Sequence, residues 1–377
     1  MTNVAATRWI FLLQPLILGA WFPRIPQIQN VLDLSVGQLA FALIGMPIGL
    51  LSALSFGAKI AEFLGTRRLL TMGMIVQCLL LPLPAFAWSG PILFVALTLA
   101  GLSLAMAQLA LNVTASLVEA QAGRAIMNGC HGFWSVGALI GSAYGVVCAS
   151  IDISPSVSLA VISALIVAPL IYIAQRMSDF TVPAKESETQ TKKRVSTPLM
   201  CVSFYAFGIA MAEGAMADWS AIYLADTYLA SPGLSGAGYT AFAAFVAIGR
   251  FLGDPMRNRF LAHHLARVFA SISLLGLATV VLSPSVIFGF IGITILGFGL
   301  SLGFPMAVSA VSILPGLSRA SNVAILTQVT LSGFLIGPPL IGLIADHYSI
   351  RFGLAALAPT LVAAVFLAQY FKPKHAR

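Results

Sequence analysis

The sequence predicts an all-α membrane protein in which twelve transmembrane helices form two six-helix bundles. Charged residues make up 8% of the 377 residues and hydrophobic residues 59%, whereas a soluble domain is typically about 25% charged. Apolar runs of about 20 residues recur along the chain, the length at which a helix crosses about 30 Å of hydrocarbon. One polar stretch near the midpoint, from Arg176 to Pro198, carries five of the twenty Lys and Arg residues.

Twelve apolar runs are predicted to span the bilayer as helices, because none of them alternates as the strands of a membrane β-barrel do. The first run lacks a signal-peptide cleavage pattern and is expected to be a retained helix. The predicted spans are residues 8–29, 36–58, 69–88, 91–118, 125–150, 156–176, 199–229, 237–255, 267–283, 286–313, 321–345 and 350–371. They divide the chain into an N-terminal bundle at residues 1–176, a cytoplasmic linker at 177–198 and a C-terminal bundle at 199–377.

Lysine and arginine residues set the predicted orientation in the bilayer. When the N-terminus is placed in the cytoplasm, eighteen of the twenty basic residues fall on that side, and only Arg24 and Arg351 fall on the other. This asymmetry is the positive-inside bias of membrane proteins, so both termini are expected to be cytoplasmic. The net charge of +8 follows from the same bias and does not indicate a nucleic-acid partner.

The four cysteines lie in apolar runs without metal-ligand spacing, so packing in the core is their expected role. They are Cys78, Cys130, Cys148 and Cys201. The sequence also contains no nucleotide-binding loop, no nucleophile elbow and no cluster of metal ligands. We therefore expect neither an enzyme nor a metal or cofactor site.

Short motifs recur between the two halves at a nearly constant offset. Gly101-Leu-Ser-Leu in the fourth span matches Gly299-Leu-Ser-Leu in the tenth, 198 residues later, and Gly137 in the fifth span matches Gly333 in the eleventh, 196 residues later. This pattern predicts a parallel duplication of six-helix halves. Small residues four positions apart in the fifth span also predict a close approach of neighbouring helices.

A loop motif follows the second span at residues 58–68, AKIAEFLGTRR, and a second copy follows the eighth span at residues 249–254, GRFLGD. Acidic and basic side chains at these helix ends can form ion pairs that hold one conformation closed. The candidate members of such conformational ion pairs are Glu62, Arg67, Arg68, Arg250 and Asp254. The two copies resemble the cytoplasmic loop signature of the major facilitator superfamily, with Ala58 where the family usually has Gly. The resemblance implies the major facilitator fold, a central site between the bundles and a monomer.

Three further stretches resemble a bacterial branch of that superfamily that includes fucose-permease-like and rhizopine (inositol-derivative) transporters. The stretches run from Glu213 to Leu224, from His131 to Ser135 and from Arg24 to Ile28. The resemblance implies a protein of the bacterial inner membrane that carries small polar, sugar-like solutes. Related sequences tend to carry an Asp shortly before the Asn of the fourth span. Here Gln108 and Asn112 occupy that region.

Glu213, Asp218 and His131 lie inside predicted spans, where a charged side chain is costly and needs a reason. Glu213 lies past the midplane of the seventh span and is a candidate for proton coupling and for accepting hydrogen bonds from solute hydroxyls. The alternative is a neutral Glu213 that is hydrogen-bonded to a neighbouring helix. Asp218 lies nearer the outer surface, where it can contact solute, cap or gate. His131 is a second candidate for proton coupling, because imidazole titrates near neutral pH, but it can equally be a packing residue.

Amide side chains and one tryptophan complete the predicted solute site. Amides donate and accept hydrogen bonds, which matches the hydroxyl groups of a polyol, and an indole ring can stack on a sugar face. Each amide alone can instead be a helix-to-helix hydrogen bond. The candidate solute-binding residues, in addition to Glu213 and Asp218, are Gln14, Gln108, Asn112, Asn128, Trp134, Asn322 and Gln328.

Together these observations predict secondary active transport of a small polar organic solute, sugar- or cyclitol-like, by alternating access and proton symport. Proton-driven efflux of amphipathic compounds or drugs is the main alternative. The drug-antiporter branch usually has a Gly-Pro pair in the fifth span, and here Gly337-Pro338-Pro339 lies in the eleventh instead. A passive uniporter also remains possible, because Glu213 could be structural. A solute sensor is disfavoured because the linker and the C-terminal tail are short.

Overall fold

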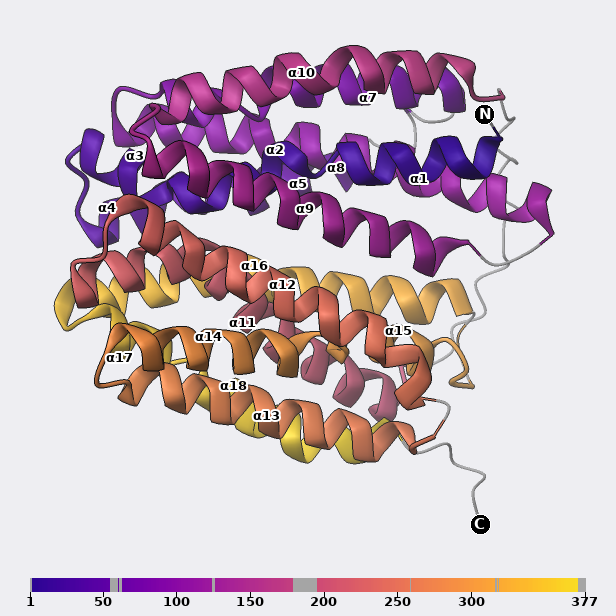
Figure 1. Cartoon of the computed structure of the whole chain (residues 1–377). Coiled ribbons are helices and arrows are strands. Elements are labelled where there is room, and N and C mark those ends of the chain that lie inside the picture. The colour runs from indigo at the N-terminus through magenta and orange to yellow at the C-terminus, as the bar shows by residue number, and fades with distance from the viewer. Residues whose placement is uncertain are drawn as a thin grey trace. The chain divides into compact units, whose positions relative to one another are not determined.

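The computed structural model describes residues 2–54, 60, 63–123, 126–178, 195–257, 259–315, 317 and 319–371. Within this part of the chain, twelve helical segments are long and apolar enough to cross a membrane. This confirms the predicted all-α fold with twelve spans (Figure 1). The boundaries differ by a few residues. The eighth candidate span, for example, begins at Pro232 rather than at residue 237.

The first six spans are built from helices that pack into one compact unit. The helices are α1 (Asn3–Leu13), α2 (Leu16–Trp21), η1 (Phe22–Arg24), α3 (Ile25–Val31), α4 (Val36–Leu43), α5 (Gly45–Leu54), α7 (Thr66–Leu80), η2 (Leu83–Phe86), α8 (Gly90–Ala122), α9 (Met127–Ser150) and α10 (Pro155–Arg176). Gly65, at the start of α7, has a φ of 73°. Only glycine adopts this conformation readily, which explains its place in the loop motif.

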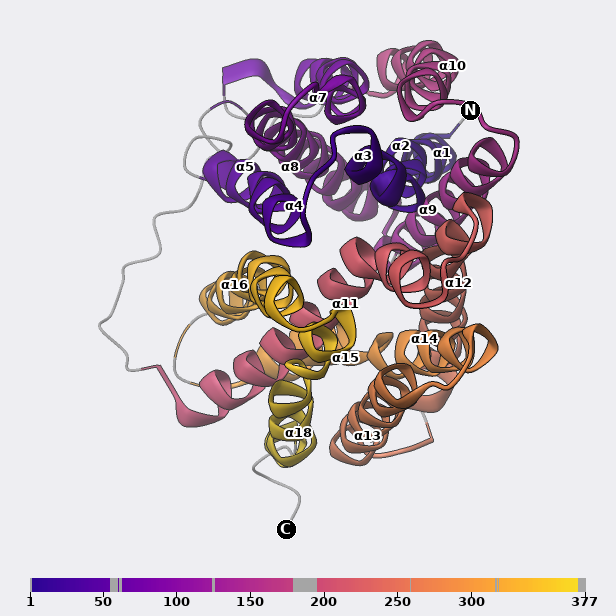
Figure 2. The same cartoon turned by 90° about the vertical axis from the view of Figure 1, so that its left-hand side faces the viewer.

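The last six spans, except for the first turns of the eighth, form the second unit. Its helices are α11 (Thr197–Tyr228), α12 (Pro232–Arg257), α13 (Ala262–Leu282), α14 (Val286–Leu300), α15 (Gly303–Val311), α16 (Arg319–His347), α17 (Ile350–Ala355), α18 (Ala358–Leu367) and η3 (Ala368–Phe371). Figure 2 views the helices of each unit nearly along their axes.

The two units do not divide only at the linker. Residues 1–186 form unit 1 together with residues 231–240, and residues 187–230 with 241–377 form unit 2. Within unit 1, Thr240 and Ser142 are hydrogen-bonded through their hydroxyl groups at 2.6 Å, and the rings of Tyr239 and Phe22 lie 4.5 Å apart. The first turns of α12 therefore group with η1 and α9.

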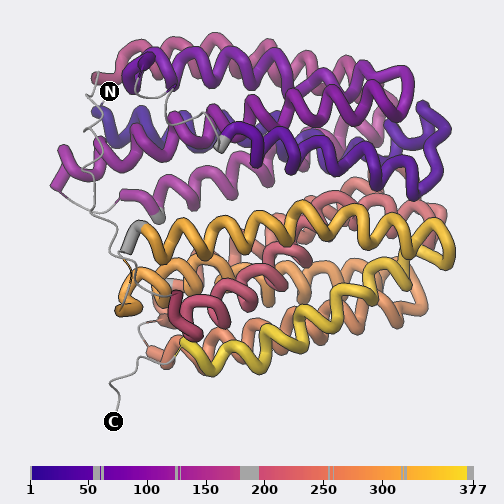
Figure 3. Tube along the Cα trace, turned by 180° about the vertical axis from the view of Figure 1, so that it is seen from behind, coloured from indigo at the N-terminus to yellow at the C-terminus, as the bar shows by residue number. Residues whose placement is uncertain are grey.

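Several spans that the sequence predicts as single helices are interrupted. The first breaks between α1 and α2, where Pro15 precedes Leu16, because proline lacks an N–H and its ring clashes with the carbonyl four residues earlier. The tenth breaks between α14 and α15, and Pro305 lies in the first turn after that break. Proline does not always interrupt a span. The helix α16 contains Pro338 and Pro339 and runs as one continuous tube in Figure 3.

Glycines in α9 bring this helix against the backbone of the first span. A Cβ atom at Gly137 would clash with the carbonyl oxygen of Leu12, and a Cβ atom at Gly141 would clash with that of Leu16. The prediction that small residues four positions apart permit close approach is confirmed at this contact. Van der Waals contact and backbone proximity then hold the helices together where apolar burial cannot, because the lipid is equally apolar.

The same contacts recur in unit 2 at an offset of 196 residues. A Cβ atom at Gly333 of α16 would lie 2.7 Å from the carbonyl oxygen of Phe207 in α11, and one at Gly337 would lie 3.3 Å from that of Met211. Gly333 and Gly337 correspond to Gly137 and Gly141. This agrees with the predicted duplication of the halves.

The fourth and tenth spans refine that duplication. A Cβ atom at Gly101 would clash with the carbonyl oxygen of Met46, and one at Gly297 would lie 2.7 Å from that of Phe242. The glycine and the residue that it contacts therefore both repeat at an offset of 196 residues. Gly299 instead faces Ser273 of α13. The equivalent of Gly101 is therefore Gly297, and the sequence match between Gly101 and Gly299 is two residues out of structural register.

Arg24 is a buried cation that no carboxylate neutralises within the described residues. Its guanidinium donates to the carbonyl oxygen of Gly145 at 3.3 Å and to that of Ile153. Both carbonyls belong to the end of α9 and the turn after it, where the helix dipole is negative. Arg24 thus ties the first span to the end of the fifth.

We predict that Gly141→Ala lowers the stability of the protein, because its Cβ would meet the carbonyl of Leu16. Overpacking of this kind costs about 1–3 kcal/mol. The matched control is Gly129→Ala in the same helix, whose Cβ would lie 3.7 Å from the nearest atom, Arg8 Nη2. The measurement is the melting temperature of both purified variants. Equal melting temperatures would contradict the close contact.

Candidate functional site

Gln14 lies at the interruption of the first span, where it caps the end of α1 directly before Pro15. Its side chain is buried. A break of this kind frees backbone groups inside a span, and neighbouring side chains must satisfy them. The break therefore places Gln14 at a point where polar side chains from other helices converge.

Three side chains from three helices meet the Gln14 amide. Its Nε2 donates to Oε1 of Gln77 in α7 at 2.9 Å, and Nε2 of Gln77 donates in turn to the backbone carbonyl of Gln14 at 3.3 Å. Its Oε1 accepts from Nε1 of Trp134 in α9 at 2.9 Å and from Nε2 of Gln108 in α8 at 3.4 Å. We call these four residues, Gln14, Gln77, Gln108 and Trp134, the glutamine network.

The glutamine network joins three residues that the sequence predicts for a solute site with one that it missed. Gln77 is buried at 1% exposure, like Gln14, and an amide in an apolar span is the signal by which the other amides were chosen. Asn112 follows Gln108 by one helical turn of α8 and is half-buried. The side chain of Asn128 lies outside the described residues.

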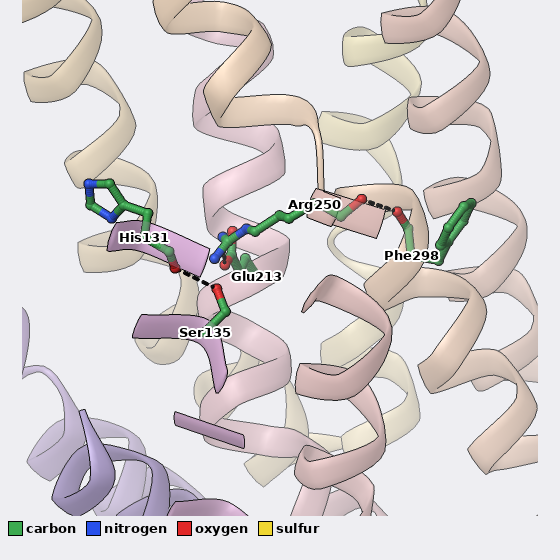
Figure 4. A network of polar contacts seen from close by, with 6 residues as sticks. His131, Ser135, Glu213, Arg250 and Phe298 are labelled. Atoms are coloured by element: carbon green, nitrogen blue, oxygen red, sulfur yellow. Dashed lines mark hydrogen bonds and ion pairs between the residues drawn. The ribbon is translucent and has the colours of Figure 1, made fainter. Parts of the chain in front are cut away.

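The main charged contact of unit 2 lies inside the spans. Nη2 of Arg250 in α12 lies 3.0 Å from Oε1 of Glu213 in α11, and the two side chains retain 29% and 25% exposure respectively. Figure 4 shows the Arg250 side chain extending to the Glu213 carboxylate. Arg250 was predicted as a member of the conformational ion pairs near Asp254. The structure pairs it with the carboxylate that the sequence selects for proton coupling.

The interruption of the tenth span lies directly beside this ion pair. A Cβ atom at Gly249 would clash with the Ser301 hydroxyl, so the glycine before Arg250 brings α12 against the break between α14 and α15. The Ser301 hydroxyl donates to the carbonyl oxygen of Phe298 at 2.6 Å. Interrupted helices of this kind line substrate and ion sites in transporters.

His131 and Asp218 take less central positions. The His131 ring is exposed and packs edge-on against Phe11, with 5.4 Å between ring centroids, and its backbone carbonyl accepts from the Ser135 hydroxyl at 3.1 Å (Figure 4). Asp218 is half-buried, and no hydrogen bond or ion pair joins it to another residue in the part of the chain that the structure describes.

Asn322 and Gln328 do not join either cluster. Asn322 is buried, and its Nδ2 donates to the carbonyls of Val311 and Leu314 at 3.1 and 3.0 Å. It therefore closes the end of α15 instead of lining a polar cavity as predicted, because free carbonyls at a helix end attract a donor. Gln328 is exposed.

The remaining loop residues can be placed only in part. Arg67 and Arg68 are exposed in the first turn of α7. Glu62 and the side chain of Asp254 lie outside the described residues, so the ion pairs predicted for them stay predictions. No group of three or more His, Cys, Asp or Glu residues that could hold a metal occurs among the residues described.

Comparison with known proteins identifies relatives over nearly the whole chain. The model of the Major Facilitator Superfamily matches residues 9–315. An uncharacterized MFS-type transporter of Yersinia pestis is 28% identical over 366 residues, which cover 97% of this chain and 95% of the relative. The membrane protein MosC of Rhizobium meliloti is 26% identical over 349 residues, covering 91% of this chain and 84% of MosC.

Solved structures share the fold at low sequence identity. The nucleoside transporter NupG superposes with a TM-score of 0.77 at 12% identity, covering 99% of this chain and all of NupG. The E. coli fucose:proton symporter FucP superposes with a TM-score of 0.64 at 17% identity, with 98% of each chain covered. These likenesses establish the architecture.

The ion pair between Glu213 and Arg250 predicts non-additive effects on stability. In Arg250→Ala the Glu213 carboxylate loses its cation, which is more costly than removing both charges. We expect the double variant Glu213→Ala/Arg250→Ala to be less destabilised than the sum of the two single variants, by about 0.5–3 kcal/mol. Melting temperatures of the four proteins complete this cycle, and strict additivity would show that the pair contributes nothing.

Proposed function

The chain belongs to the major facilitator superfamily, and we propose that it moves a small polar organic solute, sugar- or cyclitol-like, by proton-coupled alternating access. Members of this superfamily are transporters and not enzymes. The observation that carries the proposal is the ion pair of Glu213 and Arg250 at 3.0 Å within two membrane spans. Charged side chains within membrane spans cost free energy, so we expect this pair to have a function during transport.

Proton coupling follows from the charge balance of this pair. With Glu213 ionised, the pair is neutral as a whole. When Glu213 takes up a proton, the charge of Arg250 is no longer balanced by this carboxylate, so the ionised and protonated forms favour different local arrangements. A switch of this kind converts proton binding into a change of conformation. We expect this change of conformation to act on α12, because Gly249 packs this helix against the break before α15.

Solute recognition is assigned to the amide side chains. The glutamine network and Asn112 provide hydrogen-bond donors and acceptors in unit 1, which suits a solute with several hydroxyl groups. Two proteins with this fold are a fucose:proton symporter and a nucleoside transporter, and they support a hydroxylated solute as the first class to test. Asp218 and Gln328 remain candidates for solute contact, and His131 remains one for proton coupling.

The cellular setting rests on the distribution of basic residues. Eighteen of the twenty Lys and Arg residues fall on one predicted side, which supports a bacterial inner-membrane location with both termini in the cytoplasm. Symport by a monomer is the arrangement we propose, with the lipid bilayer and the solute as its partners.

We predict that Glu213→Gln abolishes proton-driven accumulation but retains exchange of solute. Glutamine keeps the size of the side chain and a hydrogen-bond acceptor, but it cannot bind and release a proton as a carboxylate does. The measurement is uptake of labelled fucose, myo-inositol and uridine into proteoliposomes with an alkaline interior, beside counterflow without a pH gradient. The control is Asp226→Asn, an exposed carboxyl in the same helix. Unchanged proton-driven uptake by Glu213→Gln would contradict this role.

A further inference from the structure

Two groups in the glutamine network have a hydrogen-bonding role that cannot be reversed, the indole of Trp134 and the backbone carbonyl of Gln14. An indole Nε1–H only donates, whereas an amide can turn over and exchange its donor and acceptor ends. Trp134 Nε1 lies 2.9 Å from Oε1 of Gln14. Chemistry alone therefore requires the oxygen of the Gln14 amide, and not its nitrogen, to face Trp134.

The orientation of the Gln14 amide also fixes the orientation of the Gln77 amide. Once the Gln14 oxygen faces Trp134, the Gln14 nitrogen must face Gln77, whose oxygen accepts at 2.9 Å. The nitrogen of Gln77 is then directed at the backbone carbonyl of Gln14, at 3.3 Å. Both side chains are buried at 1% exposure, so reversing either amide would leave opposing like groups without water to separate them, and this is costly.

The orientation of the Gln14 amide fixes that of the Gln108 amide in the same way. Its nitrogen must face the Gln14 oxygen, at 3.4 Å, so its own carbonyl oxygen is turned away from the network. The Gln108 side chain is half-buried, and its Oε1 makes no hydrogen bond within the part of the chain that the structure describes. The network therefore ends on one accessible acceptor with fixed polarity.

We propose that the glutamine network determines specificity, because Trp134 and the Gln14 backbone carbonyl together fix its polarity, so that Gln108 offers its carbonyl oxygen to a hydrogen-bond donor of the solute. This inference rests on the proposed function, in which the network borders the solute site. A hydroxyl or an N–H group at the matching position is accepted. An ether oxygen or a fluorine at that position is rejected, because two acceptors then face each other.

The polarity can be tested without a solute. In protein labelled with ¹⁵N-tryptophan, the Trp134 indole resonance is assigned as the one absent from Trp134→Phe. We expect it to be shifted downfield and protected from exchange with D2O, and to lose both properties in Gln14→Leu. Trp88→Phe, at an exposed residue outside the network, controls for the loss of a tryptophan. An indole resonance that Gln14→Leu leaves unchanged would overturn the polarity.

Specificity is tested with fucose and myo-inositol and with analogues in which fluorine replaces one hydroxyl at a time. The hydroxyl read by Gln108 is the one whose replacement weakens binding about tenfold in the wild type but not in Gln108→Leu. Trp134→Phe alone should keep that discrimination, because Gln77 still holds the Gln14 amide. The double variant Trp134→Phe/Gln77→Leu should reduce it to within about threefold, because Gln14 and Gln108 can then turn over.

The outcomes separate the two proposals. Full discrimination in Trp134→Phe/Gln77→Leu, or none in the wild type, overturns the role of the glutamine network in specificity. If neither solute binds the wild-type protein at all, the proposed solute class fails, and the indole resonance alone decides the polarity of the network. A protected indole together with lost discrimination in Trp134→Phe/Gln77→Leu supports the inference in full.

Discussion

Polar groups inside the hydrocarbon region must find partners within the protein, and the rest of this structure depends on that constraint. Water is absent there, so an unsatisfied backbone or side-chain group costs several kcal/mol. Each polar cluster described above provides partners for such groups at a place where a helix ends or breaks. Arg24 bonds carbonyls at the end of α9, and Gln77 bonds the carbonyl of Gln14 at the break of the first span.

The helix breaks also explain why polar residues gather where they do. A continuous apolar helix satisfies its own backbone and needs no polar neighbour, as α8 does over most of its length. The first and tenth spans break near prolines, and the glutamine network and the Glu213 and Arg250 pair lie beside those two breaks. Fold and function are connected at these points, because the groups that repair a break are also the groups that can bind a polar solute or a proton.

Glycine contacts supply the second element of the architecture. Equivalent glycines at an offset of 196 residues place the fifth span against the first and the eleventh against the seventh. The polar residues do not repeat in this way. Trp134 corresponds to Thr330 at that offset, and Gln77 corresponds to Ser273. The duplicated scaffold is therefore shared, whereas each unit carries its own polar chemistry, hydrogen-bonding amides in unit 1 and an ion pair in unit 2.

Much of the fold could be predicted from the sequence, because span length and the scarcity of charge are local properties. Glu213, Gln14, Gln108 and Trp134 could be selected because a polar residue in an apolar run is conspicuous. Their partners could not be assigned. Whether Arg250 reaches Glu213 or a loop carboxylate depends on the rotation of α12, which Gly249 sets through its contact with Ser301. Asn322 shows the converse case. It could be selected as a polar residue in an apolar run, but its amide donates to a carbonyl at the end of α15.

The central claim is that movement of a hydroxylated solute is tied to movement of a proton. The most direct measurement is the pH inside proteoliposomes that contain only this protein and a trapped pH-sensitive dye, while fucose, myo-inositol or uridine is added outside. The account predicts that one of these solutes acidifies the interior without an imposed gradient, and that an apolar cation does not. Solute entry without acidification, or a pH change only with apolar cations, would contradict proton symport of a polar solute.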